Sequence, residues 1–183
     1  IGQYKSSGKE GWNMSGKEEG KTYGYKVVKD VKREEFADIE EIEEIIKKEL
    51  ACRFGFIDGD EPYIAPSPFG YERNALYFHG GVNDRRAQLI QKNNKVCFEI
   101  TTDLEIVRLE KLEVCSWMSE FRRVIGKGRA FILEDDEEKS HGLNLIVNHY
   151  AKGDFVFPKD KLDITLVVKV EISSITGIRM VGF

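Results

Sequence analysis

Residues 76–86 read LYFHGGVNDRR and bring together several residue types that could do chemistry. A histidine ends a strand-like run, two glycines follow, and two arginines open a predicted helix; these residues are His79, Gly80, Gly81, Arg85 and Arg86. The first turn of a helix exposes backbone N–H groups and the positive end of the helix dipole. Arginines placed there could bind a phosphate, and glycines would let it approach the backbone. The same residues also fit a tight turn followed by a solvated helix, so both interpretations stay open.

A second feature is the segment YIAPSPFGY at residues 63–71, where Pro66 and Pro68 flank Ser67 inside a predicted strand. Proline cannot donate a backbone hydrogen bond, so this strand should lie at a sheet edge or beside a partner that is not protein. A flat aromatic ligand could cover it. An edge strand that simply leaves the sheet explains the prolines equally well.

The bulk composition limits the classes of function. The chain has 183 residues, 41% of them hydrophobic, which suits one globular domain. It carries 28 Lys plus Arg against 32 Asp plus Glu, and the resulting charge of −4 argues against a nucleic-acid partner. Hydrophobic runs such as ITLVV at 164–168 are too short to cross a membrane. The polar N-terminus lacks the apolar middle of a signal peptide, so a cytoplasmic protein is expected.

The three cysteines lie far apart in the sequence, which predicts neither a disulfide framework nor a zinc site. Cys52, Cys97 and Cys115 each have apolar neighbours, so all three are predicted to be reduced thiols in or near the core. No metal ligand set is expected.

Residues 1–30 are rich in Gly, Lys, Ser and Glu and are predicted to form a polar arm. Met14 could be a natural start preceded by vector residues. The arm could equally be a tail or a strand given to a partner. Residues 31–183 are predicted to form the folded domain.

Hydrophobic spacing predicts three helices. The segment 38–50 places five apolar residues on one stripe, namely Ile39, Ile42, Ile45, Ile46 and Leu50. A short helix is predicted at 84–93 with Asp84 as its N-cap, and a longer one is predicted to start after Asp135.

The strand candidates are 52–57, 63–67, 75–79, 95–101, 121–134 and two runs in 163–180 that are broken at Ser173 and Ser174. Turn signals between the first three predict an antiparallel meander. Gly126 and Gly128 suggest a bulge or a close backbone approach in the long strand. Six or seven mostly antiparallel strands with peripheral helices predict a mainly β protein built as a small barrel.

The ordered motifs RFGFID, PYIAPSPFGY, LYFHGG, DRRAQLIQKNNKVCFEI and CSWMSEFRRVIGKGRAFILED carry a resemblance to a known family. The chain resembles the pyridoxamine 5′-phosphate oxidase-like FMN-binding split barrels, and within them the nitroimidazole resistance (5-nitroimidazole reductase) branch. The resemblance covers about residues 38–180. It implies a six-stranded antiparallel split β-barrel that forms a homodimer with FMN at the subunit interface.

The resemblance also implies roles for particular residues. The family's basic pair that holds the FMN phosphate matches Arg85 and Arg86. The strand that passes the flavin matches Ala65, Pro66, Ser67 and Pro68, and the end of the next strand matches His79, Gly80 and Gly81. In the nitroimidazole resistance branch, the histidine that matches His79 lies close to the flavin and is the candidate catalytic residue. Trp117 and Arg123 match a strand that the partner subunit brings towards the flavin.

Two departures make vitamin B6 oxidation doubtful. The strand that carries a basic residue near each end in the oxidases has Ile64 and Phe69 here, and the chain, which ends at Phe183, lacks their substrate-binding Arg and His motif. The expectation is therefore an FMN-dependent oxidoreductase that reduces a small acceptor, such as a nitroimidazole or another nitroaromatic. In that scheme a protonated His79 could donate a proton. The alternatives are a non-catalytic flavin or haem binding or sensor module, and an interaction protein whose ligand site has decayed.

Overall fold

The computed structural model describes residues 24–111 and 115–183. Within them the chain forms nine strands and four helices. Their bounds are β1 (Tyr25–Val28), β2 (Val31–Phe36), α1 (Ile39–Lys48), β3 (Cys52–Asp58), β4 (Glu61–Ser67), β5 (Gly70–Glu72), β6 (Ala75–Gly81), α2 (Arg85–Lys92), β7 (Lys95–Leu109), β8 (Trp117–Ile132), α3 (Asp136–Tyr150), α4 (Lys159–Asp163) and β9 (Thr165–Gly182).

All nine strands join one sheet, whose main path runs β4-β3-β7-β8-β9-β6-β5. The strands at the two ends of this path, β4 and β5, are separated by only two residues in the sequence. Two residues cannot span a flat sheet, so the sheet must curl until its ends approach one another. The two ends are not hydrogen-bonded to each other, and the result is an open, split barrel. The predicted fold class, mainly β with peripheral helices, is confirmed.

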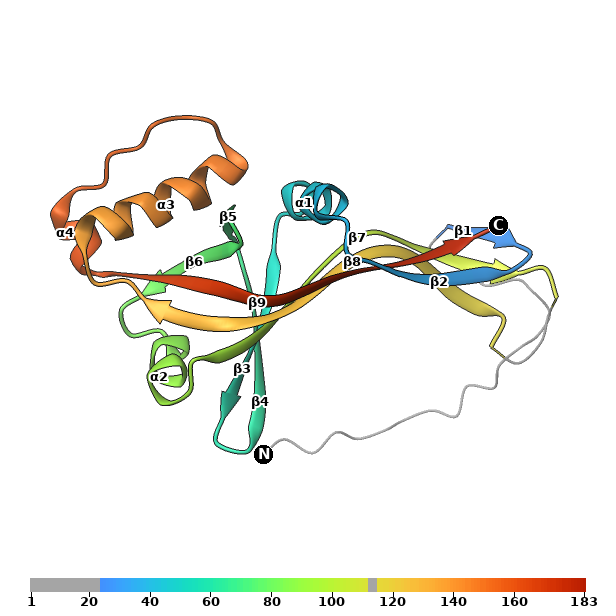
Figure 1. The fold of residues 1–183 in the computed structure, drawn as a ribbon, viewed down its shortest axis with the longest axis horizontal. Coiled ribbons are helices and arrows are strands. Elements are labelled where there is room, and N and C mark those ends of the chain that lie inside the picture. Colours follow the sequence, from blue (N-terminus) through green and yellow to red (C-terminus); the bar gives the residue numbers. More distant parts are fainter. Residues whose placement is uncertain (1–23, 112–114) are drawn as a thin grey trace, which may run out of the picture.

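The three long strands β7, β8 and β9 run the length of the molecule (Figure 1). Beyond the barrel they continue as a ribbon, where β1 pairs with β7 in parallel and β2 pairs with β9 in antiparallel orientation. Helices α3 and α4 lie over one end of the sheet, and α2 lies on its opposite side (Figure 1).

The three predicted helices form, and those at Asp84 and Asp135 begin at the predicted caps. The side chains of Asp38, Asp84 and Asp135 accept backbone hydrogen bonds in the first turns of α1, α2 and α3. Helix α1 ends two residues before Leu50, which is exposed, as is Ile39. The buried stripe of α1 is therefore narrower than predicted, and helix α4 was not predicted.

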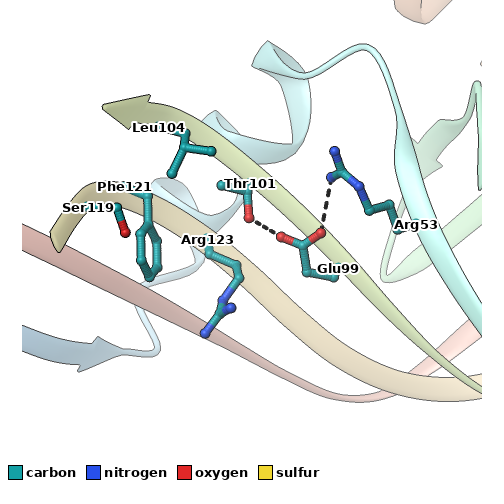
Figure 2. A pocket seen from close by; sticks show the side chains of 7 residues that line it. All are labelled: Arg53, Glu99, Thr101, Leu104, Ser119, Phe121 and Arg123. Atoms are coloured by element: carbon teal, nitrogen blue, oxygen red, sulfur yellow. Dashed lines mark hydrogen bonds and ion pairs between the residues drawn. The ribbon is translucent and has the colours of Figure 1, made fainter. Parts of the chain in front are cut away.

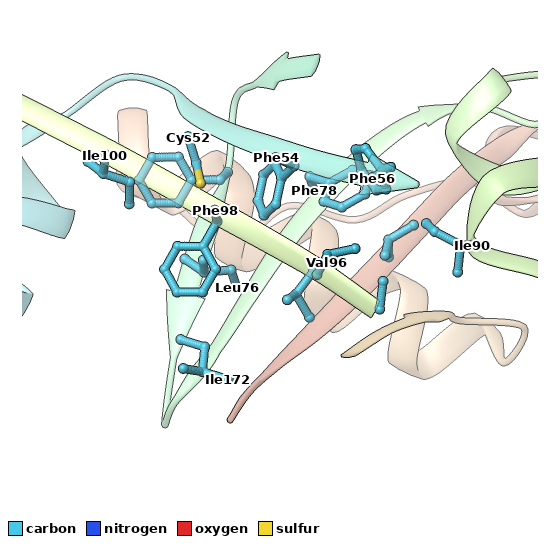
Figure 3. Packing of buried hydrophobic residues seen from close by; sticks show 14 of the residues in the cluster. Cys52, Phe54, Phe56, Leu76, Phe78, Ile90, Val96, Phe98, Ile100 and Ile172 are labelled. Carbon is cyan, nitrogen blue, oxygen red and sulfur yellow. The ribbon is translucent and has the colours of Figure 1, made fainter. Parts of the chain in front are cut away.

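Phenylalanines from several strands form the centre of the barrel core (Figure 3). The rings of Phe54 on β3 and Phe78 on β6 lie 4.7 Å apart, and Phe56 and Phe98 pack around them. A second cluster lies between α3, α4 and the sheet and includes Leu143, Ile146 and Val167. These two clusters hold β4, β6 and α2 in fixed positions.

The predicted meander is only partly correct. β3 and β4 form the expected hairpin, but β6 pairs with β9 and not with β4. β4 is an edge strand, which is one of the two positions predicted from Pro66 and Pro68. Pro62 and Pro66 lie within β4 and have no N–H to offer a further neighbour, whereas Pro68 follows the strand.

The predicted break at Ser173 and Ser174 is wrong, because β9 is one continuous strand. The register of β8 against β9 shifts between Lys127 and Gly128, where Lys127 pairs with Ser174 and Gly128 with Ile172. One extra residue, Ser173, is thus accommodated as a bulge, but it belongs to β9 and not to the strand of Gly126 and Gly128 in which a bulge was predicted. The alternative prediction, a close backbone approach, is confirmed, because a Cβ on Gly126 would lie 2.6 Å from the carbonyl oxygen of Ser174.

Two predictions concern parts of the chain away from the core. Residues 1–23 of the predicted arm lie outside the described residues, whereas residues 25–28 form β1, so the arm boundary stays a prediction.

Cys52 is buried, but Cys97 and Cys115 are exposed, contrary to the prediction. Cys97 lies between Val96 and Phe98, which face the core, so strand alternation turns its thiol outwards. Among the described residues, no helix is long and apolar enough to cross a membrane.

Candidate functional site

The turn between β6 and α2 is organised around the guanidinium of Arg86. Its side chain is 10% exposed and forms an ion pair with Asp84 at 2.5 Å. The Nε atom also donates to Asp84 at 2.9 Å, and Nη2 donates to the backbone carbonyl of His79 at 3.0 Å. Nη1 donates to the hydroxyl of Ser67 on β4. Four of the five N–H groups of Arg86 are thus engaged, which leaves one for a ligand.

This network affects the acidity of two side chains. The hydrogen bonds and charge of Arg86 hold the pKa of Asp84 below its usual value, so the carboxylate is ionised at neutral pH. The pKa of His79 is lowered first by partial burial and second by the nearby charge of Arg86. His79 is therefore mainly neutral at pH 7, and the protonated donor expected from the sequence is not favoured. A neutral imidazole can still donate one N–H and accept one hydrogen bond.

The two glycines after His79 differ in the space that surrounds them. A Cβ on Gly80 would collide with the carboxylate of Asp84 and would come within 2.7 Å of Nη2 of Arg86. A Cβ on Gly81 would meet no atom within 4 Å. Gly80 therefore makes room for the Asp84 and Arg86 pair, whereas the space beside Gly81 is open to a ligand.

Arg85 lies on the outer side of the same turn and is exposed. Its guanidinium forms an ion pair with Asp58 at the end of β3 and lies 4.9 Å from the ring centroid of Tyr63 on β4. With Arg86 neutralised by Asp84, Arg85 is the cation of this pair that a ligand could reach. Its contact with Asp58 would have to open before it could bind an anion with both of its outer nitrogens.

The segment of β4 predicted to pass the flavin contributes one side chain to this network. Ser67 is buried and bound to Arg86, whereas Ala65 is half-buried against the core. Pro66 and Pro68 are exposed. The segment therefore presents two proline rings outwards at the sheet edge, next to the β6–α2 turn.

The structure does not bring Trp117 and Arg123 to this turn within one chain. Trp117 lies in the ribbon beyond the barrel, where it pairs with Arg108 and its ring packs edge-on against Tyr25 at 4.8 Å. Arg123 lies farther along β8, opposite Thr101 of β7. Their predicted contact with the flavin of a partner subunit stays a prediction.

Three residues of the site were not assigned a role in it from the sequence. Asp58 lies in the turn between the first two predicted strands, Asp84 was predicted as a helix cap, and Tyr63 lies in a predicted strand. The pairing of Asp58 with Arg85 joins residues 27 positions apart, and it depends on the β3–β4 hairpin reaching α2. Local spacing carries no signal for such a contact. The neighbourhood of Asp84 and Arg86, in contrast, is visible in the sequence.

Comparisons with known proteins agree with this architecture. The family model for pyridoxamine 5′-phosphate oxidase matches residues 38–179. A search of curated protein sequences gave no match. Among solved structures, the chain is similar to a candidate 5-nitroimidazole antibiotic resistance protein from Bacteroides thetaiotaomicron, with 30% identity and a TM-score of 0.73 over 84% of this chain and 90% of that one.

Two more distant structures share the fold. The flavocytochrome Anf3 from Azotobacter vinelandii has 19% identity and a TM-score of 0.69, over 78% of this chain and 67% of that one. The FAD and heme binding protein from Mycobacterium smegmatis has 13% identity and a TM-score of 0.70, over 79% of this chain and 72% of that one. Because the family model spans most of the sequence and the solved neighbours reproduce the sheet, this chain belongs to the pyridoxamine 5′-phosphate oxidase family.

Proposed function

We propose that the protein binds FMN at the β6–α2 turn and acts as an oxidoreductase that reduces a small acceptor, a nitroimidazole or another nitroaromatic. The observation that carries the proposal is the position of Arg85, a positively charged side chain that a ligand can reach. Arg85 lies in the first turn of α2, four residues after Gly81, where the space beside the backbone is open. A helix start with an exposed arginine suits a phosphate monoester. The 30% identity to a candidate nitroimidazole resistance protein supports the choice of acceptor.

The residues of the turn fit the phosphate end of a flavin. Arg85 would bind the phosphate, and Gly81 leaves space beside the backbone. Arg86 would act mainly as a positioning residue, because it ties the carbonyl of His79 to β4 through Ser67. The one free N–H of Arg86 could add a single hydrogen bond to the phosphate.

Bound FMN would supply the electron transfer, while the chain supplies binding and orientation. The exposed rings of Pro66 and Pro68 would give the flavin a flat apolar wall at the edge of β4. His79 is held at its backbone by Arg86 and is neutral at pH 7. Its imidazole would therefore donate a hydrogen bond to the flavin or the acceptor, or relay a proton from solvent.

The test is anaerobic turnover with the purified protein reconstituted with FMN. A chemical reductant is supplied, and the loss of a nitroimidazole is followed by its absorbance. We expect a rate above that of free FMN at the same concentration, and a lower rate in R85Q because flavin occupancy falls. A rate equal to free FMN would remove the reductase proposal even if FMN remained bound.

A second candidate function is a flavin or haem carrier without catalysis. It is supported by two structural neighbours, the flavocytochrome Anf3 and the FAD and heme binding protein. His79, at the end of β6, would then be the candidate haem ligand. The visible spectrum of the protein as purified separates the two, because a haem Soret band would favour this candidate and flavin bands alone would favour the first.

A further inference from the structure

A pocket of about 270 Å³ lies between the first turns of α3 and the strands β6 and β9. We call it the α3 pocket, and it is lined by Tyr77, Leu133, Glu137, Glu138, His141 and Lys169. None of these six residues is expected at the flavin site. The cavity in Figure 2 differs in this respect, because it contains Arg123, which is expected beside the flavin of a partner subunit.

Tyr77 on β6 forms the wall of the α3 pocket on the side of the sheet. Its neighbours Leu76 and Phe78 belong to the barrel core, so strand alternation turns the Tyr77 ring to the opposite side, under α3. A Cβ on Gly142 of α3 would lie 3.1 Å from Cδ1 of Tyr77. The ring of His141 packs edge-on against the Tyr77 ring at 6.1 Å. These contacts hold the Tyr77 ring in place.

The hydroxyl of Tyr77 lacks a hydrogen-bond partner within the ranges 24–111 and 115–183, although Tyr77 is only 6% exposed. In contrast, the hydroxyl of Tyr150 accepts from the backbone N–H of Phe69 and donates to the carbonyl of Leu50. Burial is the largest cause that raises the pKa of Tyr77, so its hydroxyl is protonated at neutral pH. A buried hydroxyl without a partner is costly, so this atom marks a place where a further group can bind.

The unpaired charge in the α3 pocket is negative. Lys169 forms an ion pair with Glu171 at 2.9 Å, which neutralises its charge. Glu137 and Glu138 form no ion pair with any residue that the structure describes, and both are exposed. Two carboxylates are therefore available to a cation that enters the pocket.

The lining of the α3 pocket indicates what kind of cation would fit. A primary ammonium has three N–H donors and no acceptor, and the two carboxylates and the Tyr77 hydroxyl oxygen are all acceptors. The rings of Tyr77 and His141 and the side chain of Leu133 offer apolar contact, and the face of an aromatic ring attracts a cation. The volume suits a ligand smaller than a typical drug molecule.

We propose that the α3 pocket binds a small organic ammonium ion with a flat apolar body, held by Glu137, Glu138 and the hydroxyl of Tyr77. This site goes beyond the proposed flavin site and does not depend on it. The ammonium would give the Tyr77 hydroxyl its missing partner, and Leu133 and His141 would contact the apolar body.

The test uses the full chain and three probes that share a phenyl ring but differ in charge, namely benzylammonium, benzyl alcohol and benzoate. Proton–nitrogen correlation NMR follows the backbone amide signals of residues 137–142 at constant ionic strength. We expect benzylammonium to move these signals at the lowest concentration. Its dissociation constant should rise about three- to tenfold in Y77F, the range for one hydrogen bond. In the double variant E137Q/E138Q it should rise about two- to tenfold.

The matched control for charge is E134Q, since Glu134 is exposed just before α3 and does not line the pocket. Benzylammonium binding should be unchanged in E134Q. An equal loss in E134Q and in the double variant would reduce the effect to general charge attraction and overturn the proposal. Tighter binding of benzoate would also overturn it, because Lys169 would then select an anion. Displacement of benzylammonium by FMN would assign the pocket to the flavin site.

Thermal unfolding tests the state of the Tyr77 hydroxyl separately. Y77F removes a hydroxyl without a partner, so its midpoint temperature should equal that of the wild-type chain or exceed it. Y150F removes a hydroxyl with two partners and should unfold at a lower temperature. A folded Y77F that binds benzylammonium as tightly as the wild-type chain would overturn the proposal. Should Y77F fail to fold, the hydroxyl has a structural partner, and the proposal fails as well.

Discussion

Two adjacent arginines at the start of α2 have opposite environments. Arg86 is buried among Asp84, Ser67 and the carbonyl of His79, whereas Arg85 is exposed and held by Asp58. An arginine in the first helical turn works against the helix dipole. The buried pair of Arg86 with Asp84 offsets this cost, so the motif has a structural reason in addition to any ligand.

The first prediction concerns the stability that the charge of Asp84 provides. In D84N the helix cap can remain, but buried Arg86 loses its counter-charge, so we expect a loss of about 1–3 kcal/mol in the free energy of unfolding at pH 7. The pKa of Asp84 is lower in the folded chain than its ordinary value of 3.8. The contribution is therefore complete above about pH 4 and is lost as the pH falls through the lower, folded value.

Urea unfolding at pH 7 and pH 3 measures this difference. D135N is the matched control, since Asp135 also caps a helix but its side chain accepts hydrogen bonds from the backbone N–H groups of Glu137 and Glu138. Asn caps about as well as Asp, so D135N should cost little at either pH. Equal losses in D84N and D135N would mean that the pair with Arg86 contributes nothing.

The second prediction concerns competition for Arg85. The carboxylate of Asp58 occupies the guanidinium that we propose for the FMN phosphate. D58N should therefore bind FMN about two- to fivefold more tightly, the range expected for one exposed ion pair. R85Q should bind FMN more weakly. Quenching of flavin fluorescence on titration measures both constants.

Asp60 provides the control for D58N, because it lies in the same hairpin turn and is exposed. D60N removes the same charge at nearly the same place. Tighter binding in both variants would indicate a general effect of net charge, and no change in D58N would exclude Asp58 as a competitor.

At the scale of elements, patterns local in sequence were predictable and contacts between distant elements were not. Helix starts follow from single aspartates, and the edge position of β4 follows from its prolines. The pairing of β6 with β9 could not be predicted, because it joins residues 84 to 96 positions apart, from Gly81 with Thr165 to Ala75 with Glu171, and such distant partners leave no local signal. The same holds for the site. The glycines and arginines near His79 could be identified from the sequence, whereas Asp58 and Tyr63 could not, because the β3–β4 hairpin brings them to Arg85.

The third prediction tests the packing of α3 on β5. A Cβ on Gly70 would lie 2.5 Å from the carbonyl carbon of Leu145 and 2.6 Å from the nitrogen of Ile146. These are backbone atoms of α3, which cannot turn aside as a side chain could. G70A should therefore lower the free energy of unfolding by about 1–3 kcal/mol. G81A, where the space is open, should change it by less than about 0.5 kcal/mol. Thermal and urea unfolding of both variants measure these changes in the free energy of unfolding. Equal losses in G70A and G81A would contradict this packing.

At the scale of the whole molecule, one face of the sheet carries three exposed isoleucines. Ile57, Ile64 and Ile125 are 41%, 68% and 42% exposed. The strand register puts them on one side of β3, β4 and β8, the side that also carries Cys97. Exposed apolar side chains that gather on one face are typical of protein–protein interfaces. We therefore propose that this face forms the homodimer interface.

The fourth prediction follows from that interface. A glutamate at position 64 would be buried against the second subunit, so I64E should sediment as a monomer where the wild-type chain sediments as a dimer. If the flavin site is completed by the partner, I64E should also lose FMN. V156E is the control, because Val156 is 91% exposed in the segment between α3 and α4 and lies away from this face. Circular dichroism must show that both variants are folded. A folded I64E that remains a dimer would place the interface elsewhere, and a monomeric I64E that retains FMN would confine the flavin site to one chain.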